Sequence, residues 1–308
     1  MRHHPGARAA SRPHSESQLK APLRDEYDVG MMIGPLGVWV SPRAIGEAQL
    51  GEAAQVAETC GYNVFWVGGS PRLPTLRALL DATQTLVVAT GIVNIWTYEP
   101  AALAAEFAEL DADFPERVLV GIGVGHPEAT SDYTRPLSAM RTFLDGLDDA
   151  DKPVPHDRRC LAALAPRMLD LSRERALGAC PYFVPVAHTA AARAALGSGH
   201  LLAPEVAVVV DEDKNAARAT AREYARLYLG LGNYATNLLR HGFDEADVAE
   251  GGSDRLLDAV VPQGTPDEVA GVLHAHLDAG ADHVAVQTLG EPGIPAGSWA
   301  AVAQAFTR

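Results

Sequence analysis

The sequence has few basic residues, with only three lysines beside 22 arginines, and its acidic residues outnumber its basic residues by 39 to 25. The resulting formal net charge of −14 argues against a nucleic acid or an anionic membrane surface as partner, because such partners require a basic surface. An anionic cofactor would then have to be held by local backbone donors rather than by the overall field.

Cysteine is equally scarce. Cys60, Cys160 and Cys180 are odd in number and far apart, without a CxxC or Cys/His spacing, so we expect neither a disulfide framework nor a metal site. Three buried thiols in a reducing, cytoplasmic compartment are the simplest interpretation. Hydrophobic residues at 47% and charged residues at 21% are typical of a globular protein.

Long apolar runs are also missing, and none approaches the roughly 20 residues that a membrane span needs. Residues 1–28 hold three prolines and scattered charges without an apolar core, which excludes a typical secretory signal. We therefore predict a disordered extension over 1–30, or a start at Met31 or Met32, followed by one domain over 31–308.

Short apolar runs alternate with helical periodicity from Gly30 onward. Near-continuous apolar runs are typical of parallel strands that are covered on both faces. Helix boundaries are marked by signals such as Thr265 and Pro266 at a start and Gly61 at an end. We predict strands over 34–40, 63–67, 86–95, 117–124, 159–164, 180–185, 201–210 and 283–289.

Eight strands at roughly 30 residues per unit predict an α/β fold, a single (βα)8 TIM barrel. The spacing fails once, because 72 residues separate the strands that end at 210 and begin at 283. We interpret this segment as a helical insertion between strands 7 and 8, with helices over 213–231, about 234–241 and 244–260. Insertions at the carboxyl face of a barrel build lids and substrate walls.

Two glycine-marked strand ends carry the functional information. In RVLVGIGVGHP (117–127) a strand leads into Gly121, Gly123 and Gly125, where backbone can approach a ligand closely. A Rossmann turn is disfavoured, because the motif follows a fourth strand and His126-Pro127 interrupts a helix start. In LVVATGIVNIWTYEP (86–100), glycine followed by β-branched residues indicates a bulge or a long core strand.

Together these segments, TGIVNIWTYEPAALAAEFAELDADFPERVLVGIGVGHP, and the late segment GTPDEVAGVLHAHLDAGADHVAVQTL (264–289) resemble the bacterial-luciferase-like superfamily, especially its coenzyme F420-dependent oxidoreductases. The resemblance covers roughly residues 33–308. It implies a (βα)8 barrel with a late insertion, a cofactor ring in the barrel mouth, and a dimer as a common assembly.

The resemblance also implies positions for the cofactor. A non-prolyl cis peptide backing the middle ring maps to Gly91–Ile92, and the fourth-strand glycine loop to Gly121–Gly125. The polar residue beside the reacting carbon maps to His126, and the phosphate tail maps to Leu164–Pro166 and Pro181–Val184. The cofactor-binding residues so predicted are Gly68, Ser70, Gly91, Ile92, Asn94, Gly123, Gly125, Ala165, Pro181, Tyr182 and Phe183.

The sequence departs from the family pattern twice. Strand 2 ends in Val67-Gly68-Gly69-Ser70 rather than an acid and a histidine, and Ala163-Leu164-Ala165-Pro166 replaces a Gly-Gly pair after strand 5. The first departure leaves no general acid or base at that strand end. Both departures leave F420 and FMN as alternative cofactors.

Several side chains are candidates for the chemistry itself. His126 is a candidate acid or base, since imidazole exchanges a proton near neutral pH, although a loop histidine that only lines the pocket is the alternative. Trp39 is a candidate for a substrate or ring-stacking wall, or ordinary packing. Further expectations are a joint apolar pocket from Trp96, Tyr98, Tyr182 and Phe183, phosphate donors or a plain cap at His188 and Thr189, and a packing role for His276.

Three functions remain in competition. The leading hypothesis is an oxidoreductase that exchanges hydride between F420 and a small apolar or carbonyl-bearing substrate. The second is a luciferase-like monooxygenase that uses reduced FMN and O2. The third is a non-catalytic flavin- or F420-binding barrel, suggested by the missing acid and histidine of strand 2.

Overall fold

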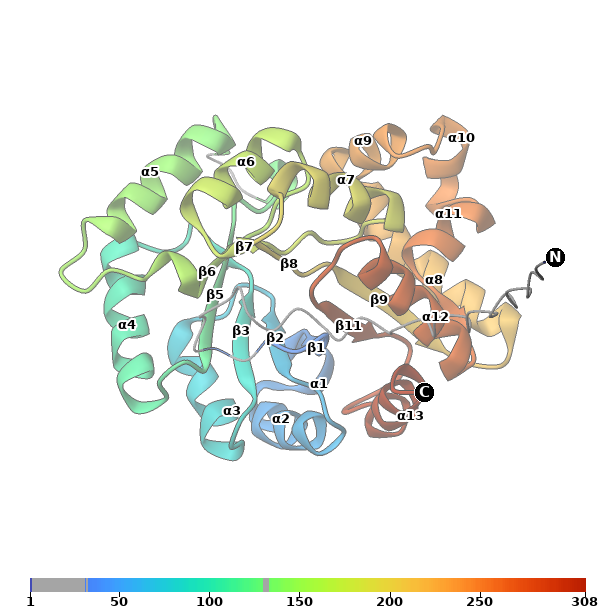
Figure 1. Ribbon diagram of the computed structural model, residues 1–308, viewed down its shortest axis with the longest axis horizontal. Coiled ribbons are helices and arrows are strands. Elements are labelled where there is room, and N and C mark those ends of the chain that lie inside the picture. Colours follow the sequence, from blue (N-terminus) through green and yellow to red (C-terminus); the bar gives the residue numbers. More distant parts are fainter. Residues whose placement is uncertain (2–30, 32, 130–132) are drawn as a thin grey trace.

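The computed structural model describes residues 1, 31, 33–129 and 133–308. The extension expected over 1–30 therefore lies outside the described residues, apart from Met1. In the remainder, strands and helices alternate, and Figure 1 shows the helices arranged around a central group of strands. No helix in this part of the chain is long and apolar enough to cross a membrane.

Eight parallel strand positions form a closed ring. Each strand pairs in parallel with the next, and the eighth position pairs with the first. The positions are β1 (Leu36–Val40), β2 (Val64–Gly68), β3 (Val87–Gly91), β5 (Val118–Gly123), β6 (Arg159–Leu161), β7 (Gly178–Ala179), β8 with β9 (Leu201–Leu202 and Glu205–Val210), and β11 (Val284–Thr288).

Closure of the ring depends on a single interrupted strand. β8 pairs with β7, whereas β9, two residues later, pairs with β11. Across the interruption, the Glu205 N–H donates to the Pro181 carbonyl and the Ala285 N–H donates to the Pro204 carbonyl. The predicted strand 201–210 is therefore split into two parts, of which the first pairs with β7 and the second with β11. The predicted α/β architecture with a parallel sheet is confirmed.

The helices between strands form the outer layer. They are α1 (Pro42–Ile45), α2 (Leu50–Thr59), α3 (Arg77–Ala82), α4 (Pro100–Asp113), α5 (Pro136–Asp148), α6 (Pro166–Arg175), α7 (Val186–Leu196), α12 (Pro266–Asp278) and α13 (Ala296–Phe306). Four more helices lie between β9 and β11: α8 (Lys214–Leu229), α9 (Gly232–Arg240), α10 (Glu245–Val248) and α11 (Asp254–Val260).

Three predicted elements differ from the observed ones. The strand expected over 86–95 is interrupted after Gly91 and resumes as β4 (Val93–Asn94). The strand expected over 180–185 is a loop after β7, because Pro181 has no N–H to donate and Phe183 has a left-handed φ of 54°. The helix expected over 244–260 is broken between α10 and α11, where Glu250, Gly251 and Gly252 all have positive φ.

A smaller set of differences concerns element ends. β6 stops at Leu161 rather than 164, and a short strand, β10 (Gln263–Gly264), pairs with the end of β9 without having been predicted. The start of α12 follows the predicted signals, since Thr265 and Glu268 form a capping box.

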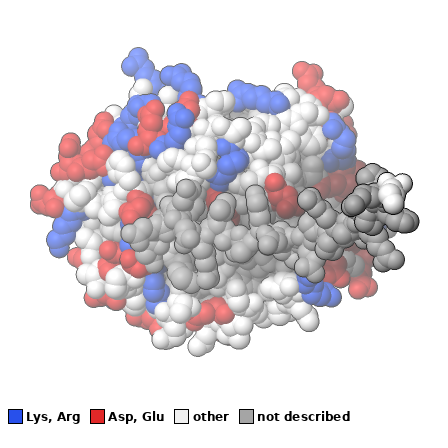
Figure 2. Space-filling model, viewed as in Figure 1, with Lys and Arg blue, Asp and Glu red and all other residues white. Residues whose placement is uncertain are grey.

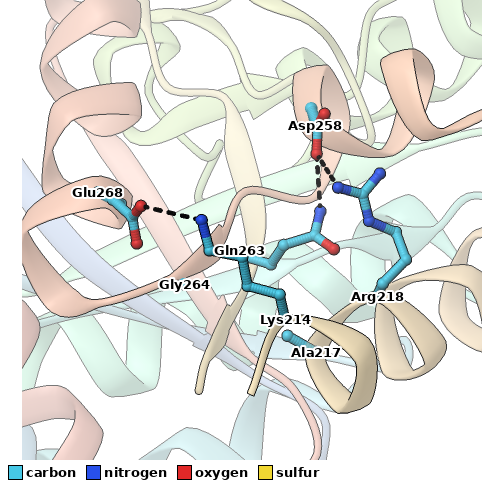
Figure 3. Close-up of a pocket in the computed structure, with 7 residues that line it drawn as sticks. All are labelled: Lys214, Ala217, Arg218, Asp258, Gln263, Gly264 and Glu268. Atoms are coloured by element: carbon cyan, nitrogen blue, oxygen red, sulfur yellow. Dashed lines mark hydrogen bonds and ion pairs between the residues drawn. The ribbon is translucent and has the colours of Figure 1, made fainter. Parts of the chain in front are cut away.

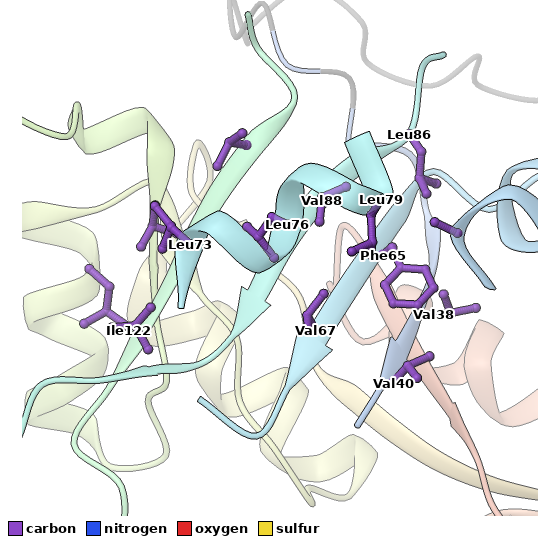
Figure 4. Close-up of a cluster of buried hydrophobic side chains, with 14 of the residues drawn as sticks. Val38, Val40, Phe65, Val67, Leu73, Leu76, Leu79, Leu86, Val88 and Ile122 are labelled. Atoms are coloured by element: carbon purple, nitrogen blue, oxygen red, sulfur yellow. The ribbon is translucent and has the colours of Figure 1, made fainter. Parts of the chain in front are cut away.

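The core has two layers because most strand residues are buried on both faces. The outer layer packs between strands and helices, and Figure 4 shows Phe65 and Val88 next to Leu79. The inner layer fills the barrel and includes Trp66, Ala89, Leu119, Cys160 and Ala285. Each fully buried aliphatic side chain contributes about 1.5–3 kcal/mol, so the ring is a packed scaffold for its mouth.

Candidate functional site

Trp39 lies across the carboxyl ends of β1 to β3. A Cβ atom added to Gly68 or to Gly91 would overlap its indole ring, so only glycine fits at either position. On its other side the indole ring lies 5.4 Å from the ring of Tyr182, centroid to centroid. Trp39 therefore bridges the first three strands and the loop after β7, inside the barrel mouth.

The bulge predicted in strand 3 is present. The Gly91–Ile92 peptide bond is cis, as the resemblance implied. The Ile92 side chain packs on β5, where a Cβ on Gly123 would come within 2.6 Å of Ile92 Cδ1. Below the bulge, the Thr90 hydroxyl donates to the Gly121 carbonyl at 2.8 Å. Glycine at 121 and 123 thus lets two neighbouring strand ends approach closely.

Ser70 and Asn94 hold three strand ends together. The Ser70 Oγ accepts a hydrogen bond from the Asn94 N–H at 3.1 Å, and the Asn94 Oδ1 accepts one from the Trp96 N–H at 3.0 Å. A Cβ on Gly125, whose φ is 60°, would lie 2.9 Å from Asn94 Nδ2. The ends of β2, β4 and β5 therefore form one continuous rim of backbone.

His126 follows this rim and faces the helices after β9. Its Nδ1 lies 3.3 Å from the Asn233 Oδ1, and its ring centroid lies 5.2 Å from that of Tyr234. Burial lowers the pKa of His126 below its usual value of 6.5, although Asn233 and Glu128 oppose that shift. The imidazole is therefore neutral at neutral pH and suited to accept a proton.

Aromatic side chains build the opposite wall of the mouth. The Tyr182 hydroxyl is central, with Tyr224 at 2.8 Å, Tyr228 at 2.9 Å and the Gln287 Oε1 at 2.7 Å. The Phe183 ring stacks on that of Tyr228 at 5.2 Å between centroids. Burial raises the pKa of Tyr182 well above its usual value, so this hydroxyl carries its proton at all ordinary pH values.

Glu205 is the residue that sequence reasoning missed. It lies on β9 and is only 4% exposed. Its Oε2 accepts the Phe183 N–H at 3.3 Å, while Oε1 has no hydrogen-bond partner among residues 31, 33–129 and 133–308. Burial raises the pKa of Glu205 to about 8, although hydrogen bonding by Phe183 and Tyr224 lowers it. The available signal was an acid within the otherwise apolar run LLAPEVAVVV.

The predicted phosphate region lies at two helix starts. α6 begins after Ala165 and α7 after Pro185, and neither start has a side-chain cap. The free N–H groups of such starts attract anions. Pro181 is buried in the loop that leads from β7 to α7.

His188 and Thr189 have other partners than the expected phosphate. The His188 Nε2 lies 3.1 Å from the Leu164 carbonyl oxygen, and burial lowers the pKa of His188 to about 4. The Thr189 Oγ1 lies 2.8 Å from the His276 Nδ1. Both side chains are therefore engaged in packing, as is His276, which is 1% exposed.

The four aromatics expected to form one pocket do not all meet. The Trp96 Nε1 donates to the Val124 carbonyl at 2.7 Å, and its ring faces Tyr133. The Tyr98 hydroxyl accepts the Leu73 N–H at 3.1 Å and bonds Glu106. Only Tyr182 and Phe183 belong to the aromatic wall, because their loop lies next to α8 and α9.

A cavity of about 250 Å³ lies apart from this mouth, between α8, α11, β10 and α12. Figure 3 shows that its charges pair with one another, as in Arg218 with Asp258 at 2.7 Å and Lys214 with Glu268 at 4.0 Å. On the molecular face in Figure 2, basic and acidic side chains are likewise interspersed. We therefore place the candidate site at the barrel mouth.

Comparisons with known proteins bear on the family and the fold of the chain. Residues 35–150 match the family described as luciferase-like monooxygenase. A 5,10-methylenetetrahydromethanopterin reductase of Methanolobus tindarius is 24% identical over 290 residues, covering 75% of this chain and 87% of the relative. An N-acetyl-S-alkylcysteine monooxygenase of Bacillus subtilis (strain 168) is 28% identical over 131 residues, but the match spans 37% of this chain and 39% of that protein.

Three solved structures share the fold. The coenzyme F420 dependent tetrahydromethanopterin reductase of Methanopyrus kandleri has a TM-score of 0.71 at 18% identity, over 90% of this chain and 99% of its own. An F420-dependent secondary alcohol dehydrogenase in complex with an F420-acetone adduct has a TM-score of 0.69 at 16% identity, over 89% of this chain and 99% of its own. The oxygenating constituent of the 3,6-diketocamphane monooxygenase of Pseudomonas putida, in complex with FMN, has a TM-score of 0.64 at 15% identity, over 88% of this chain and 96% of its own.

The chain thus matches the luciferase-like monooxygenase family over residues 35–150. As a whole it shares its TIM-barrel fold with F420-dependent enzymes and with a monooxygenase in complex with FMN.

Proposed function

We propose that this protein is an F420-dependent oxidoreductase that exchanges hydride between coenzyme F420 and a small organic substrate at the carboxyl-terminal mouth of the barrel. The observation that carries the proposal is the mouth itself, where a rim of glycine backbone faces an aromatic wall beside two uncapped helix starts. The proteins that match most of the chain include one F420-dependent reductase and one F420-dependent dehydrogenase, which supports this cofactor.

The residues of the mouth fit a flat, anionic cofactor. Apolar and aromatic groups around few polar atoms are typical of cofactor sites, and here Trp39, Ile92 and Tyr182 supply the apolar faces. The rim at Gly123 and Gly125 would lie beside the ring system. When bound, F420 supplies two-electron hydride chemistry, while the protein orients it and excludes water.

The phosphate-bearing tail would lie at the starts of α6 and α7. Backbone N–H groups at Ala165, Arg167 and Val186 provide the local donors that a chain of net charge −14 needs for an anion. No Gly-Gly pair is required for this, because helix starts present backbone donors with any side chain.

We further infer that α8 to α11 are a helical insertion between barrel strands 7 and 8 that closes one side of the mouth. α8 carries Tyr224 and Tyr228, α9 carries Tyr234, and all three pack around Tyr182 or Phe183. Such a wall would select small apolar or carbonyl-bearing substrates. A monooxygenase that uses reduced FMN is the second candidate, since monooxygenases also match the chain.

The test is cofactor binding to the purified protein. We expect F420 to bind and FMN to bind more weakly, as measured by fluorescence and equilibrium dialysis. Ala165→Asp places a carboxylate at the uncapped start of α6, where it favours the helix but repels a phosphate, so F420 affinity should fall about tenfold, or about 1.4 kcal/mol. Ala190→Asp, exposed further along α7, is the control. Tight FMN binding without F420 binding would overturn the proposal.

A further inference from the structure

We propose that Glu205 is the internal proton donor of the barrel mouth and that it acts through the hydroxyl groups of Tyr224 and Tyr182. The inference rests on the proposed function, because a hydride transferred to a carbonyl or alkene must be matched by a proton. It supplies the acid that the end of β2 lacks, where Gly68, Gly69 and Ser70 leave no group able to donate one.

The surroundings of Glu205 hold its carboxyl neutral. The side chain is 4% exposed, and among the described residues no arginine, lysine or histidine forms an ion pair with it. Within the described part of the chain, the Phe183 N–H at 3.3 Å is the only backbone donor to it. A buried carboxylate without a cation is strongly disfavoured, so the group keeps its proton until the solution is alkaline. Oε1, which has no hydrogen-bond partner among the residues that the structure describes, is then a donor whose proton is not held by another group.

A chain of hydroxyl groups connects this donor with the mouth. Tyr224 belongs to the same cluster as Glu205, because the Phe183 N–H donates to the Glu205 carboxyl and the Phe183 ring lies 6.1 Å from that of Tyr224, centroid to centroid. The Tyr224 hydroxyl lies 2.8 Å from that of Tyr182. Tyr182 is partly exposed, and its ring faces Trp39 across the mouth. Tyrosine hydroxyls both donate and accept, so each can pass on a proton and regain one.

The other groups around this chain do not compete as acids. Tyr228, also on α8, and Tyr234, on α9, are phenols whose pKa values burial raises, with Glu205 as a further cause. From β11, Gln287 accepts hydrogen bonds from Tyr182 at 2.7 Å and from Tyr224 at 3.2 Å. Glu205 is thus the group in this cluster that changes charge closest to neutral pH.

The reaction proposed for a ketone is its reduction to an alcohol, which requires one hydride and one proton. Reduced F420, when bound, would supply a hydride and be oxidised, so that a C–H bond forms at the carbonyl carbon with the two electrons of that hydride. The C=O π pair moves to oxygen, which takes the Tyr182 proton as that O–H bond breaks. Tyr182 regains a proton from Tyr224, and Tyr224 regains one from Glu205, which ends as the carboxylate. The product is an alcohol.

The first experiment needs no cofactor. Infrared difference spectra of the purified protein should show a protonated-carboxyl band that disappears with a midpoint near pH 8. Glu205→Gln, which is isosteric and neutral, should lack this titration, whereas Glu212→Gln, an exposed acid just beyond the same strand, should retain it. An identical titration in Glu205→Gln and the unmodified protein would overturn the proposal.

The second experiment measures reduction of simple ketones by reduced F420. We expect kcat to fall as pH rises through about 8 and Glu205→Gln to lower kcat on the order of 10²-fold and to remove that pH dependence. Tyr224→Phe should lower kcat similarly while keeping the infrared band, since only the connection is broken. Full activity in both variants would overturn the proton path. Absence of F420 binding would instead defeat the proposed function, and the infrared titration would still decide the protonation of Glu205.

Discussion

The two halves of the barrel are built differently. From β1 to β5 the strands at the ring positions have five or six residues, and the mouth is made of backbone and glycine around Trp39. In the second half the strands from β6 to β8 have two or three residues, whereas β9 has six and β11 has five. The mouth in this half is made of side chains from α8 and α9 and from the loop after β7. The family match over residues 35–150 covers the first half.

This difference indicates a division of labour. A wall of backbone tolerates few substitutions, because glycine positions are set by neighbouring strands. A wall of tyrosine side chains can change its shape and hydrogen bonding without altering the ring. We therefore expect the first half to fix where a cofactor lies and the second to determine which substrate fits.

The largest effect should come from glycines whose Cβ would meet backbone. A Cβ on Gly121, in the first half, would overlap the Thr90 carbonyl, and one on Gly178, in the second half, would overlap Leu201 backbone. Each Gly→Ala change should cost about 3 kcal/mol or more of unfolding free energy, at the upper end for overpacking. Urea unfolding measures this. Gly271→Ala, in open space on α12, is the control and should stabilise by about 0.5–1 kcal/mol.

If only Gly121→Ala proved destabilising, the strands of the second half would not approach each other closely enough to require glycine at Gly178. The difference between the two halves would then be larger than the structure alone indicates. Equal tolerance of both substitutions would contradict the close strand approach described for either half.

The next largest effect should come from His126, the candidate proton acceptor of the first half, as Glu205 is the proposed proton donor of the second. His126→Ala should lower kcat/KM on the order of 10²-fold. Because burial lowers the pKa of His126 below 6.5, its neutral form predominates at neutral pH, and activity that needs it should decline only in more acidic solution. The variant should lose this acid limb and keep the alkaline one, as read from the pH–rate profile. An unchanged profile would remove His126 from the mechanism.

A smaller effect should follow from the ion pair beneath β6. Arg159 is 1% exposed and pairs with Asp148, which also bonds Arg175. Burial acts to raise the pKa of Asp148, but hydrogen bonds from both arginines lower it below 3.8. Asp148→Asn should cost about 2 kcal/mol, less than a fully buried pair, because a third of the Asp148 side chain is exposed.

The sign of its pH dependence follows from the lowered pKa. The stabilisation is present above the unfolded pKa near 3.8 and is lost as pH falls through the folded value. The gap between Asp148→Asn and the unmodified protein in chemical unfolding should therefore close in acid. A gap that widens below pH 3.8 would refute the assignment.

The smallest effect should come from the start of α8. Asp213 caps this helix by accepting the N–H groups of Asn215 and Ala216 at 2.9 and 3.2 Å. Asp213→Ala should cost about 1 kcal/mol and loosen the helix that carries Tyr224 and Tyr228, as hydrogen exchange would show. Glu212→Ala, its exposed neighbour, should have no such effect.

Much of the fold could be predicted from the sequence because its signals are local. Apolar runs located the eight strand positions, and Thr265 with Pro266 located the start of α12. The failures arose where a local signal was overridden. Pro181 ends the pairing of an apolar stretch, and Glu250 to Gly252 turn the chain inside a helical pattern.

The candidate site was more predictable in its first half than in its second, where the sequence pointed to Tyr182 and Phe183 but not to their partners. Gly91, Gly123 and Gly125 were marked by glycine at strand ends, whose meaning is carried by the backbone. Glu205 and the tyrosines of α8 gave no such pattern, because their proximity depends on how distant segments pack. Their roles, like those of the predicted cofactor-binding residues, stay predictions until a ligand is bound.

The pairing of β10 with β9 has a consequence for how such a protein can diversify. The Val209 N–H bonds the Pro262 carbonyl and the Asp211 N–H bonds the Gly264 carbonyl, at 3.0 Å each. The chain therefore leaves the ring and returns to it at adjacent points, and residues 214–260 lie between these points. Recombination or engineering could exchange this helical segment as a unit and leave the eight-stranded barrel intact.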